Sequence, residues 1–290
     1  MRNWLRPFAF EVPKDLDTAL RLLAADPGVR AFAGGTDLMV LLESGKLPPG
    51  RYVNIWGLGE LRGMAVGADH VSLGALTTYT DVLSDPVLQS EFPLLCSAAR
   101  QTGGIATQNR GTLGGNIANA SPAADSPPAL LVYDAELELR SIRGVRRTPY
   151  SRFHTGYKAT DLAPGEIISR IFLPRRQSTW RQTYRKVGTR SAQAISKVCL
   201  AAALDLDGNR VRDVRVAFGS VAPTPIRCTK VEAALRDRIP DSELASAVSA
   251  ALISDISPID DLRSTARYRL RVAQNLLIQF LTDTVSGRSH

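Results

Sequence analysis

The glycine-rich stretch from Arg110 to Asp125 places the strongest constraint on what this chain can fold into. It has the sequence RGTLGGNIANASPAAD, with three glycines and almost no large apolar side chain. A core helix or core strand needs a repeating apolar stripe, so the pattern predicts a loop here. Glycine allows φ > 0 and lets a ligand approach the main chain closely. Successive N–H groups in such a loop can hold a polyanion such as a pyrophosphate.

A second loop of the same kind, Ala33-Gly34-Gly35-Thr36-Asp37, lies upstream. It follows an apolar stretch at 29–33 that favours a strand. The residues after it, 38–42, favour a helix capped by Thr36 or Asp37. A strand, a glycine turn and a helix N-terminus together form an anion site. The loop matches neither G-x-G-x-x-G nor a phosphate loop ending in G-K-[ST]. Each loop alone could be a tight surface turn, but two of them favour a ligand site.

Length and composition indicate a globular protein with a full core. The chain has 290 residues, of which 44% are hydrophobic and 22% charged. No run approaches the roughly 18 apolar residues of a membrane span. No secretory leader is recognisable at the start, so we expect the protein in the cytoplasm. The cysteines, Cys96, Cys199 and Cys228, are far apart and form no C-x-x-C, so we expect neither an iron–sulfur cluster nor a zinc site on this chain.

Positive charge is concentrated in the middle of the chain. The formal net charge is +8, and the segment 140–190 holds 13 Lys or Arg against two acids, Asp161 and Glu166. A solvated basic face, a wall around an anionic cofactor and a surface for an acidic partner subunit all fit this pattern. Nucleic-acid binding fits the charge as well, but no helix-turn-helix, zinc-finger or RNP-like pattern accompanies it, so we predict none.

The layout changes after a polar link at 174–179, which is the candidate domain boundary. Two strands are predicted beyond it, at 196–205 and 211–218, joined by the turn Asp207-Gly208-Asn209. Helices are predicted from apolar periodicity over three later segments, 229–235, 241–253 and 265–281.

Four stretches, in order along nearly the whole chain, resemble one known family. They are Ala33–Asp37, Gln108–Asn116, Tyr184–Arg190 and Asp260–Arg269. The chain resembles the FAD-binding, medium-sized subunit of the molybdenum hydroxylases, which include xanthine dehydrogenase and carbon monoxide dehydrogenase.

The resemblance implies an α+β fold in three parts. Two FAD-binding subdomains of the vanillyl-alcohol-oxidase (PCMH-like) type would span residues 1–57 and 58–176. A C-terminal domain of the carbon monoxide dehydrogenase flavoprotein type, with a small antiparallel sheet and a helical bundle, would span residues 177–290.

The resemblance also implies an oxidoreductase subunit that transfers electrons through FAD. A small partner subunit would carry two [2Fe-2S] clusters and deliver the electrons. A large partner subunit would carry molybdopterin and hydroxylate the substrate, and the complex is expected to be a dimer of heterotrimers. No catalytic residue or metal ligand is expected on this chain itself.

The substrate implied is purine- or xanthine-like, or another N-heterocycle or an aldehyde. A carbon monoxide dehydrogenase subunit and a self-sufficient flavin oxidoreductase of the same fold remain alternatives. A non-catalytic basic interaction protein whose glycine loops are turns is a third. The final electron acceptor is open among NAD, oxygen, quinone and a carrier protein.

Particular residues of the chain match cofactor contacts of the family. Asp125 matches a carboxylate that contacts the adenosine half of FAD, although it could also cap a helix near Ser126. Lys186 matches a lysine close to the isoalloxazine ring, although it could be a surface lysine. Ile168 matches an apolar cover, and Thr102-Gly103 matches a position close to the ring. The full set of expected cofactor residues is Phe32, Ala33, Gly34, Gly35, Thr36, Asp37, Thr102, Gly103, Thr112, Leu113, Gly114, Gly115, Asn116, Asp125, Ile168 and Lys186.

Overall fold

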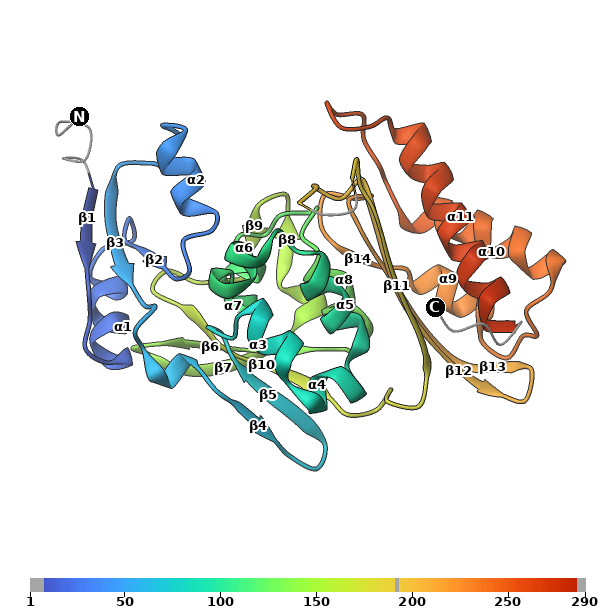
Figure 1. Cartoon of the computed structure of the whole chain (residues 1–290), viewed down its shortest axis with the longest axis horizontal. Coiled ribbons are helices and arrows are strands. Elements are labelled where there is room, and N and C mark those ends of the chain that lie inside the picture. Colours follow the sequence, from blue (N-terminus) through green and yellow to red (C-terminus); the bar gives the residue numbers. More distant parts are fainter. Residues whose placement is uncertain (1–7, 191–192, 286–290) are drawn as a thin grey trace.

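The computed structural model describes residues 8–190 and 193–285. It contains three principal sheets with helices packed between and beside them, arranged along the long axis of the molecule (Figure 1). The predicted α+β class is therefore confirmed. The predicted boundaries after residues 57 and 176 stay a prediction.

The N-terminal part is a small parallel sheet with two helices. Its strands lie in the order β1-β3-β2. Helix α1 forms because Leu16, Ala19, Leu20 and Leu23 make a buried stripe, and because Asp15 accepts a hydrogen bond from the Thr18 N–H at its start. The elements are β1 (Phe8–Glu11), α1 (Leu16–Ala25), β2 (Arg30–Phe32), α2 (Leu38–Glu43) and β3 (Gly50–Asn54).

The middle part is an antiparallel sheet in the order β4-β5-β10-β6-β7, with a group of short helices on one side (Figure 1). A two-stranded ladder, β8 with β9, stands apart from this sheet. The elements are η1 (Gly59–Leu61), β4 (Met64–Val66), β5 (His70–Gly74), α3 (Tyr79–Ser84), α4 (Pro86–Glu91), α5 (Pro93–Gln101), α6 (Ile105–Arg110), α7 (Leu113–Ala118), α8 (Ser126–Val132), β6 (Glu136–Ser141), β7 (Gly144–Pro149), η2 (Tyr150–Arg152), β8 (His154–Gly156), β9 (Ala159–Thr160) and β10 (Ile167–Pro174).

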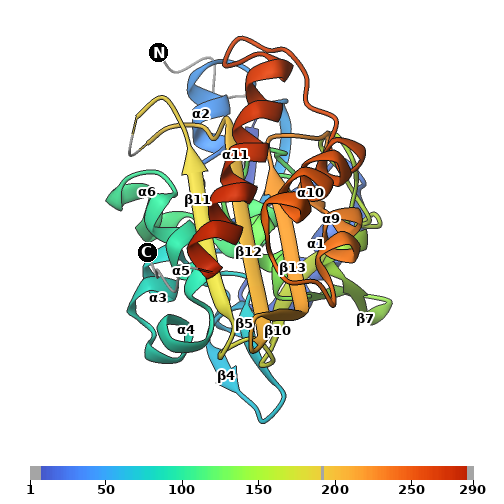
Figure 2. The same cartoon turned by 90° about the vertical axis from the view of Figure 1, so that its right-hand side faces the viewer.

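The C-terminal part is an antiparallel sheet in the order β11-β12-β13-β14, with three helices over one face (Figure 2). The structure confirms the predicted hairpin through Asp207-Gly208-Asn209. It also confirms a helix in each of the three predicted segments, with bounds that differ by at most a few residues. The elements are β11 (Arg181–Val187), β12 (Val198–Asp207), β13 (Arg210–Gly219), β14 (Ile226–Arg227), α9 (Thr229–Leu235), α10 (Ser242–Asp255) and α11 (Ala266–Val285).

Strand β12 is buried on both faces, which explains its continuous apolar sequence VCLAAAL. Val198, Leu200 and Leu204 pack under the C-terminal helices. Cys199 and Ala201, which point the other way, belong to the core of the middle part. One hydrophobic core therefore crosses from the middle part into the C-terminal sheet.

The glycine-rich stretch that we expected to be a loop contains a helix. Helix α7 spans Leu113–Ala118, and α6 ends just before it. The Thr112 side chain accepts a hydrogen bond from the Gly115 N–H and so caps α7. A Cβ on Gly114 would lie 2.7 Å from the Ala75 Cβ, so the small residues permit close packing against the neighbouring segment. Tertiary packing has overridden the low helix propensity of glycine.

Candidate functional site

The two glycine loops meet in the folded chain. The Arg110 Nε donates to the Gly34 carbonyl at 3.4 Å, across 76 residues of sequence. The Asn119 amide donates to Asp37 Oδ1 at 3.3 Å. The Arg110 guanidinium also lies over the Trp56 ring, 3.9 Å from its centroid. The loops therefore form one site rather than two separate surface turns.

A cavity of about 630 Å³ opens at the place where the loops meet. This volume is within the usual range for small-molecule and cofactor sites. Part of its wall belongs to the core of the N-terminal part, including Leu23 and Val29. Another part comes from the middle part, including Tyr79. The expected cofactor residues that line the cavity are Ala33, Gly34, Gly35, Thr36, Asp37, Thr102, Thr112, Gly114, Gly115, Asn116 and Ile168.

The first loop has the free donors that an anion needs. Among the described residues, the backbone N–H groups of 34–37 donate to no acceptor in the chain. Gly35 has φ +78°, the left-handed conformation that glycine adopts without strain. Asp37 occupies the N-cap position of α2, but its side chain makes no capping bond within the described chain. The segment is open to receive negative charge at the start of a helix.

The second loop does not offer the same open donors, contrary to our expectation. The N–H groups of Leu113 and Gly114 donate to the carbonyls of Thr77 and Ala75, both at 2.9 Å. Those of Gly115 and Asn116 donate to Thr112. Forming α7 has consumed these groups. The second loop therefore lines the cavity as closely packed backbone.

The two glycines of the first loop allow close approaches that a side chain would block. A Cβ built on Gly34 would lie 1.7 Å from the Arg110 carbonyl oxygen, which no real contact permits. A Cβ on Gly35 would lie 2.8 Å from the Phe32 ring and would meet an unfavourable φ. This cradle of glycine with unpaired N–H groups fits the diphosphate of a dinucleotide such as FAD.

Asp125 and Lys186 form a buried ion pair beside the cavity. The Lys186 Nζ donates to Asp125 Oδ2 at 2.7 Å, and the two side chains are 7% and 10% exposed, respectively. Lys186 also donates to the Gln101 carbonyl at 2.9 Å. Asp125 makes no capping bond to α8. Helix capping and a surface lysine, the alternatives weighed from the sequence, therefore do not describe these residues.

The pair brings two of the expected contacts together. The resemblance placed Asp125 at the adenosine half of FAD and Lys186 at the ring. Because one hydrogen bond joins them, they lie together at one end of any extended ligand. Thr102, which matches a position close to the ring, also donates to Asp125 Oδ2, at 3.5 Å. Asp125, Lys186 and Thr102 therefore form one cluster, and the part of the cofactor that this cluster meets stays a prediction.

One carboxylate oxygen of Asp125 has no hydrogen-bond donor within the described chain. Among the described residues, Oδ1 is buried and has no hydrogen-bond partner. Burial raises the pKa of Asp125 to about 6, against the lowering effect of Lys186. Tyr79, which lines the cavity, is buried, and its pKa is raised first by desolvation and then by Asp125. Asp125 and Lys186 are not among the residues that line the cavity and adjoin it through Thr102, which is. A buried acceptor without a donor in this position fits a ligand that brings an N–H or O–H.

The other expected residues have different places. Ile168 is buried and lines the cavity. Phe32 packs edge-on against Phe10, with 5.5 Å between the ring centroids. Its ring also lies against the backbone of Gly35. Leu113 is completely buried in the core, so its side chain cannot reach a ligand. Gly103, with φ +59°, lies in the turn before α6 and outside the cavity lining.

Several residues at the site were not in the expected set, although Asn119 had been noted in the glycine-rich stretch for its polar side chain. Tyr79, Asn119 and Arg30 line the cavity. Tyr184 donates from its hydroxyl to the Asp125 carbonyl at 3.0 Å. Asn119 lies in the glycine-rich stretch and carries an amide, which was a usable signal. The other three look like ordinary core or surface residues in the sequence, and only the fold brings them to the site.

The structure offers no metal centre in its described part. No group of three or more His, Cys, Asp or Glu is placed to hold a metal ion among residues 8–190 and 193–285. The three cysteines are buried. Within the same residues, no helix has the length and apolar character that crossing a membrane requires.

Comparison with protein families gives two matches that together span most of the chain. A family described as the FAD binding domain in molybdopterin dehydrogenase matches residues 6–176. A family described as the CO dehydrogenase flavoprotein C-terminal domain matches residues 182–284.

Individual relatives agree with these matches over nearly their whole length. The chain is 34% identical over 274 residues to the xanthine dehydrogenase FAD-binding subunit of Escherichia coli O157:H7, with 94% of each chain covered. It is 32% identical over 273 residues to the glyceraldehyde dehydrogenase medium chain of Sulfolobus acidocaldarius, with 94% of this chain and 96% of the relative covered.

Solved structures share the fold. A chain of carbon monoxide dehydrogenase from Hydrogenophaga pseudoflava superposes with a TM-score of 0.91 at 29% identity, covering 95% of this chain and 96% of that one. A chain of quinoline 2-oxidoreductase from Pseudomonas putida 86 superposes with a TM-score of 0.90 at 26% identity, covering 98% of both.

Proposed function

The chain belongs to the family of FAD-binding domains of molybdopterin dehydrogenases, and from this membership we propose that it is the FAD-carrying subunit of a molybdenum-dependent dehydrogenase complex. Its work is to bind the flavin and conduct electrons. FAD supplies the redox chemistry when bound, taking up electrons and passing them on, and the protein supplies binding, orientation and electrostatics.

The proposal assigns the parts of the cavity to parts of the cofactor. The N–H groups of 34–37 would hold the diphosphate. The end marked by Thr102 and the Asp125–Lys186 pair would take the flavin. The apolar lining that includes Leu23 and Val29 would take the adenosine half. These assignments remain proposals, as does the set of cofactor residues expected from the sequence.

The complex is proposed to contain the partners that the family implies. Electrons would arrive from [2Fe-2S] clusters on a small subunit, and a large subunit with molybdopterin would oxidise the substrate. The relatives bear the names of xanthine and glyceraldehyde dehydrogenases, and a solved neighbour is a carbon monoxide dehydrogenase. The substrate-oxidising pocket is assigned to the large subunit. A xanthine-like, N-heterocyclic or aldehyde substrate remains part of the proposal, and so does the cytoplasmic location.

The observation that carries the proposal is the convergence of the two glycine loops on one cavity. Surface turns separated by 76 residues of sequence would have no reason to share a hydrogen bond and a cavity wall. A self-sufficient flavin oxidoreductase would need an acid–base group of its own at the cavity. Asp125 is paired with Lys186, and Glu166, which lines the cavity, is paired with Arg146.

Purified protein tests the proposal directly. We expect the chain to carry, or to take up, one FAD per molecule, with flavin absorbance bands and no iron–sulfur absorbance. FMN, which lacks the adenosine half, should bind much more weakly. Protein that binds neither flavin, or that binds FMN as tightly as FAD, would contradict the proposal.

Partner dependence separates the subunit from a free-standing oxidoreductase. The isolated, FAD-loaded chain should not oxidise xanthine-like, N-heterocyclic or aldehyde substrates. Mixing it with its iron–sulfur and molybdopterin partner subunits should give bleaching of the flavin by substrate. Bleaching by substrate without any partner would favour the free-standing alternative.

A further inference from the structure

Helix α8 connects the cavity to the C-terminal domain. Asp125 stands immediately before its first residue, and all residues of Ser126–Val132 are buried. At this end, two residues of β11 hold Asp125: Lys186 through its carboxylate and Tyr184 through its carbonyl. The proposed flavin end of the site is therefore built from a helix of one domain and a strand of another.

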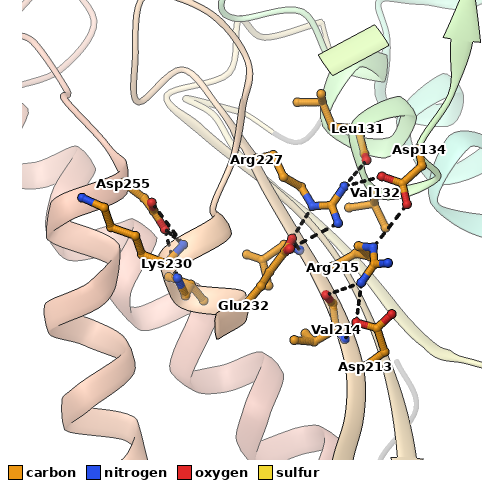
Figure 3. A network of polar contacts seen from close by, with 12 residues as sticks. Leu131, Val132, Asp134, Asp213, Val214, Arg215, Arg227, Lys230, Glu232 and Asp255 are labelled. Atoms are coloured by element: carbon orange, nitrogen blue, oxygen red, sulfur yellow. Dashed lines mark hydrogen bonds and ion pairs between the residues drawn. The ribbon is translucent and has the colours of Figure 1, made fainter. Parts of the chain in front are cut away.

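The opposite end of α8 is held by the same C-terminal domain. Figure 3 shows Arg227 and Arg215 converging on Asp134, just beyond the helix. Arg227 Nη1 donates to Asp134 Oδ1 at 2.6 Å and to the Leu131 carbonyl at 3.0 Å. Arg215 Nε donates to Asp134 Oδ2 at 3.2 Å. A cation at the last carbonyls of a helix complements its dipole.

The arginines are themselves fixed on the C-terminal domain. Glu232 pairs with Arg227 (Figure 3). It also accepts from the Val216 N–H at 2.8 Å. The Glu232 side chain is 3% exposed. Asp213 pairs with Arg215 in the same way. We call Asp134, Arg215, Arg227 and Glu232 the α8 clamp.

Asp134 follows the C-cap residue of α8, and its N–H and that of Ala135 donate to the Leu131 and Leu130 carbonyls at 3.2 and 3.0 Å, a common helix-ending pattern. Its φ is +51°, in the left-handed region that asparagine and aspartate tolerate best. This conformation turns the chain at the end of α8 and directs the carboxylate to the two arginines.

We propose that the α8 clamp is a positioning device for the flavin end of the cofactor site. It fixes the C-terminal end of α8 on the C-terminal domain, so that Asp125 at the other end stays aligned with Lys186. A seven-residue helix spans roughly 10 Å, so a movement at Asp134 is carried to Asp125 through a short, fully packed rod. The inference rests on the proposed function, because its readout is FAD binding.

Asp134→Asn is the sharpest test, because asparagine accepts the same backbone conformation and removes only the charge. Asp134 is 46% exposed and its ion pairs are partly screened, so we expect a modest loss, about three- to tenfold weaker FAD binding. The matched control is Arg212→Gln, which breaks an ion pair with Asp205 on the same sheet, away from α8. It should leave FAD affinity unchanged.

A double-mutant cycle distinguishes positioning from general destabilisation. In an Asp125→Asn background the pair with Lys186 is already gone, so Asp134→Asn should cost little further FAD affinity while lowering the melting temperature as before. In the flavin-free protein, hydrogen exchange at 126–132 should rise in Asp134→Asn and not in Arg212→Gln.

The outcomes separate the two proposals. Wild-type protein that takes up no FAD overturns the proposed function and the clamp's role with it. Wild-type protein that binds FAD while Asp134→Asn binds it equally well overturns the clamp alone. An equal loss of affinity in both backgrounds also overturns it, because the effect would not act through Asp125.

Discussion

At the scale of single residues, the Asp125–Lys186 pair determines the electrostatics of the site. The sequence suggested a lysine that presents a free cation to the flavin, and the structure gives that cation a buried counter-charge. The pair as a whole is close to neutral. Removing Asp125 would make the proposed flavin end more positive, and removing Lys186 would make it less positive.

The flavin reduction potential should report this pairing. Asp125→Asn leaves Lys186 as an unpaired cation, which favours the reduced, anionic flavin, so the potential should rise above that of the wild type. One kcal/mol of differential stabilisation corresponds to about 20 mV for two electrons. In Lys186→Met, Asp125 would take up a proton, and the potential should be equal to or below that of the wild type. Potentiometric titration of the three proteins checks the order, and a fall in Asp125→Asn would contradict it.

The stability of the flavin-free protein should depend on pH through Asp125. Its pKa is raised in the folded state from 3.8 to about 6, so between these values the folded state binds more protons than the unfolded state. Stability contributed by this group therefore falls as pH rises from about 4 to 6, by a few kcal/mol at most. Denaturant unfolding of the wild type and Asp125→Asn at several pH values measures the difference, which should be constant above about pH 7. A difference that is independent of pH throughout would show that the carboxyl titrates normally.

At the scale of elements, the connection from β2 to α2 is the part of the site whose geometry a single Cβ would change. Gly35 combines a positive φ with a position in the cavity wall. The segment from Thr112 to Asn116 has closed into α7 and uses its own N–H groups. We therefore expect substitutions in the first loop to act on the ligand and substitutions in α7 to act first on packing.

Gly35→Val should give a folded protein that has lost FAD. The new side chain would meet Phe32 and impose an unfavourable φ beside the N–H groups of 34–37. The control is Gly63→Val, since Gly63 has φ +80° and no atom within 4 Å of its virtual Cβ. Both variants should stay folded with lowered melting temperatures by circular dichroism, Gly35→Val more so because of the Phe32 contact, and only Gly35→Val should lack flavin absorbance. Full flavin occupancy in Gly35→Val would remove the first loop from the cofactor site.

At the scale of the whole molecule, the C-terminal domain is part of the core and not an appendage. Tyr184, Cys199 and Ala217 lie in the same buried cluster as Leu95 and Tyr133 of the middle part. The polar bonds at both ends of α8 cross the same boundary. A chain that separated at the polar link of residues 174–179 would expose this core.

The chain should therefore unfold in one cooperative step in spite of its three sheets. Circular dichroism, tryptophan fluorescence and calorimetry should give coincident transitions, with calorimetric and van't Hoff enthalpies in agreement. The fragment 1–176 expressed alone should be loosely packed and unable to bind FAD, and coexpression with 177–290 should restore binding. Two separate transitions would show that the domains are independent.

The sequence by itself determined the features that depend on local chemistry. Glycines with short polar neighbours marked both loops, Asp15 and the apolar stripe after it marked α1, and Asp207-Gly208-Asn209 marked a hairpin. These patterns work because caps, turns and periodic burial are set by residues within a few positions of one another.

Tertiary structure alone decided what requires distant parts of the chain to meet. It paired Asp125 with Lys186 across 61 residues, so that two contacts expected at different parts of the cofactor lie side by side. It made a helix of Leu113–Ala118, because Thr77, Ala75 and Thr112 accept its N–H groups. It left the N–H groups of 34–37 without acceptors in the described chain. No local pattern encodes these outcomes, because the hydrogen-bond partners and the low-dielectric surroundings arise only when the three sheets pack together.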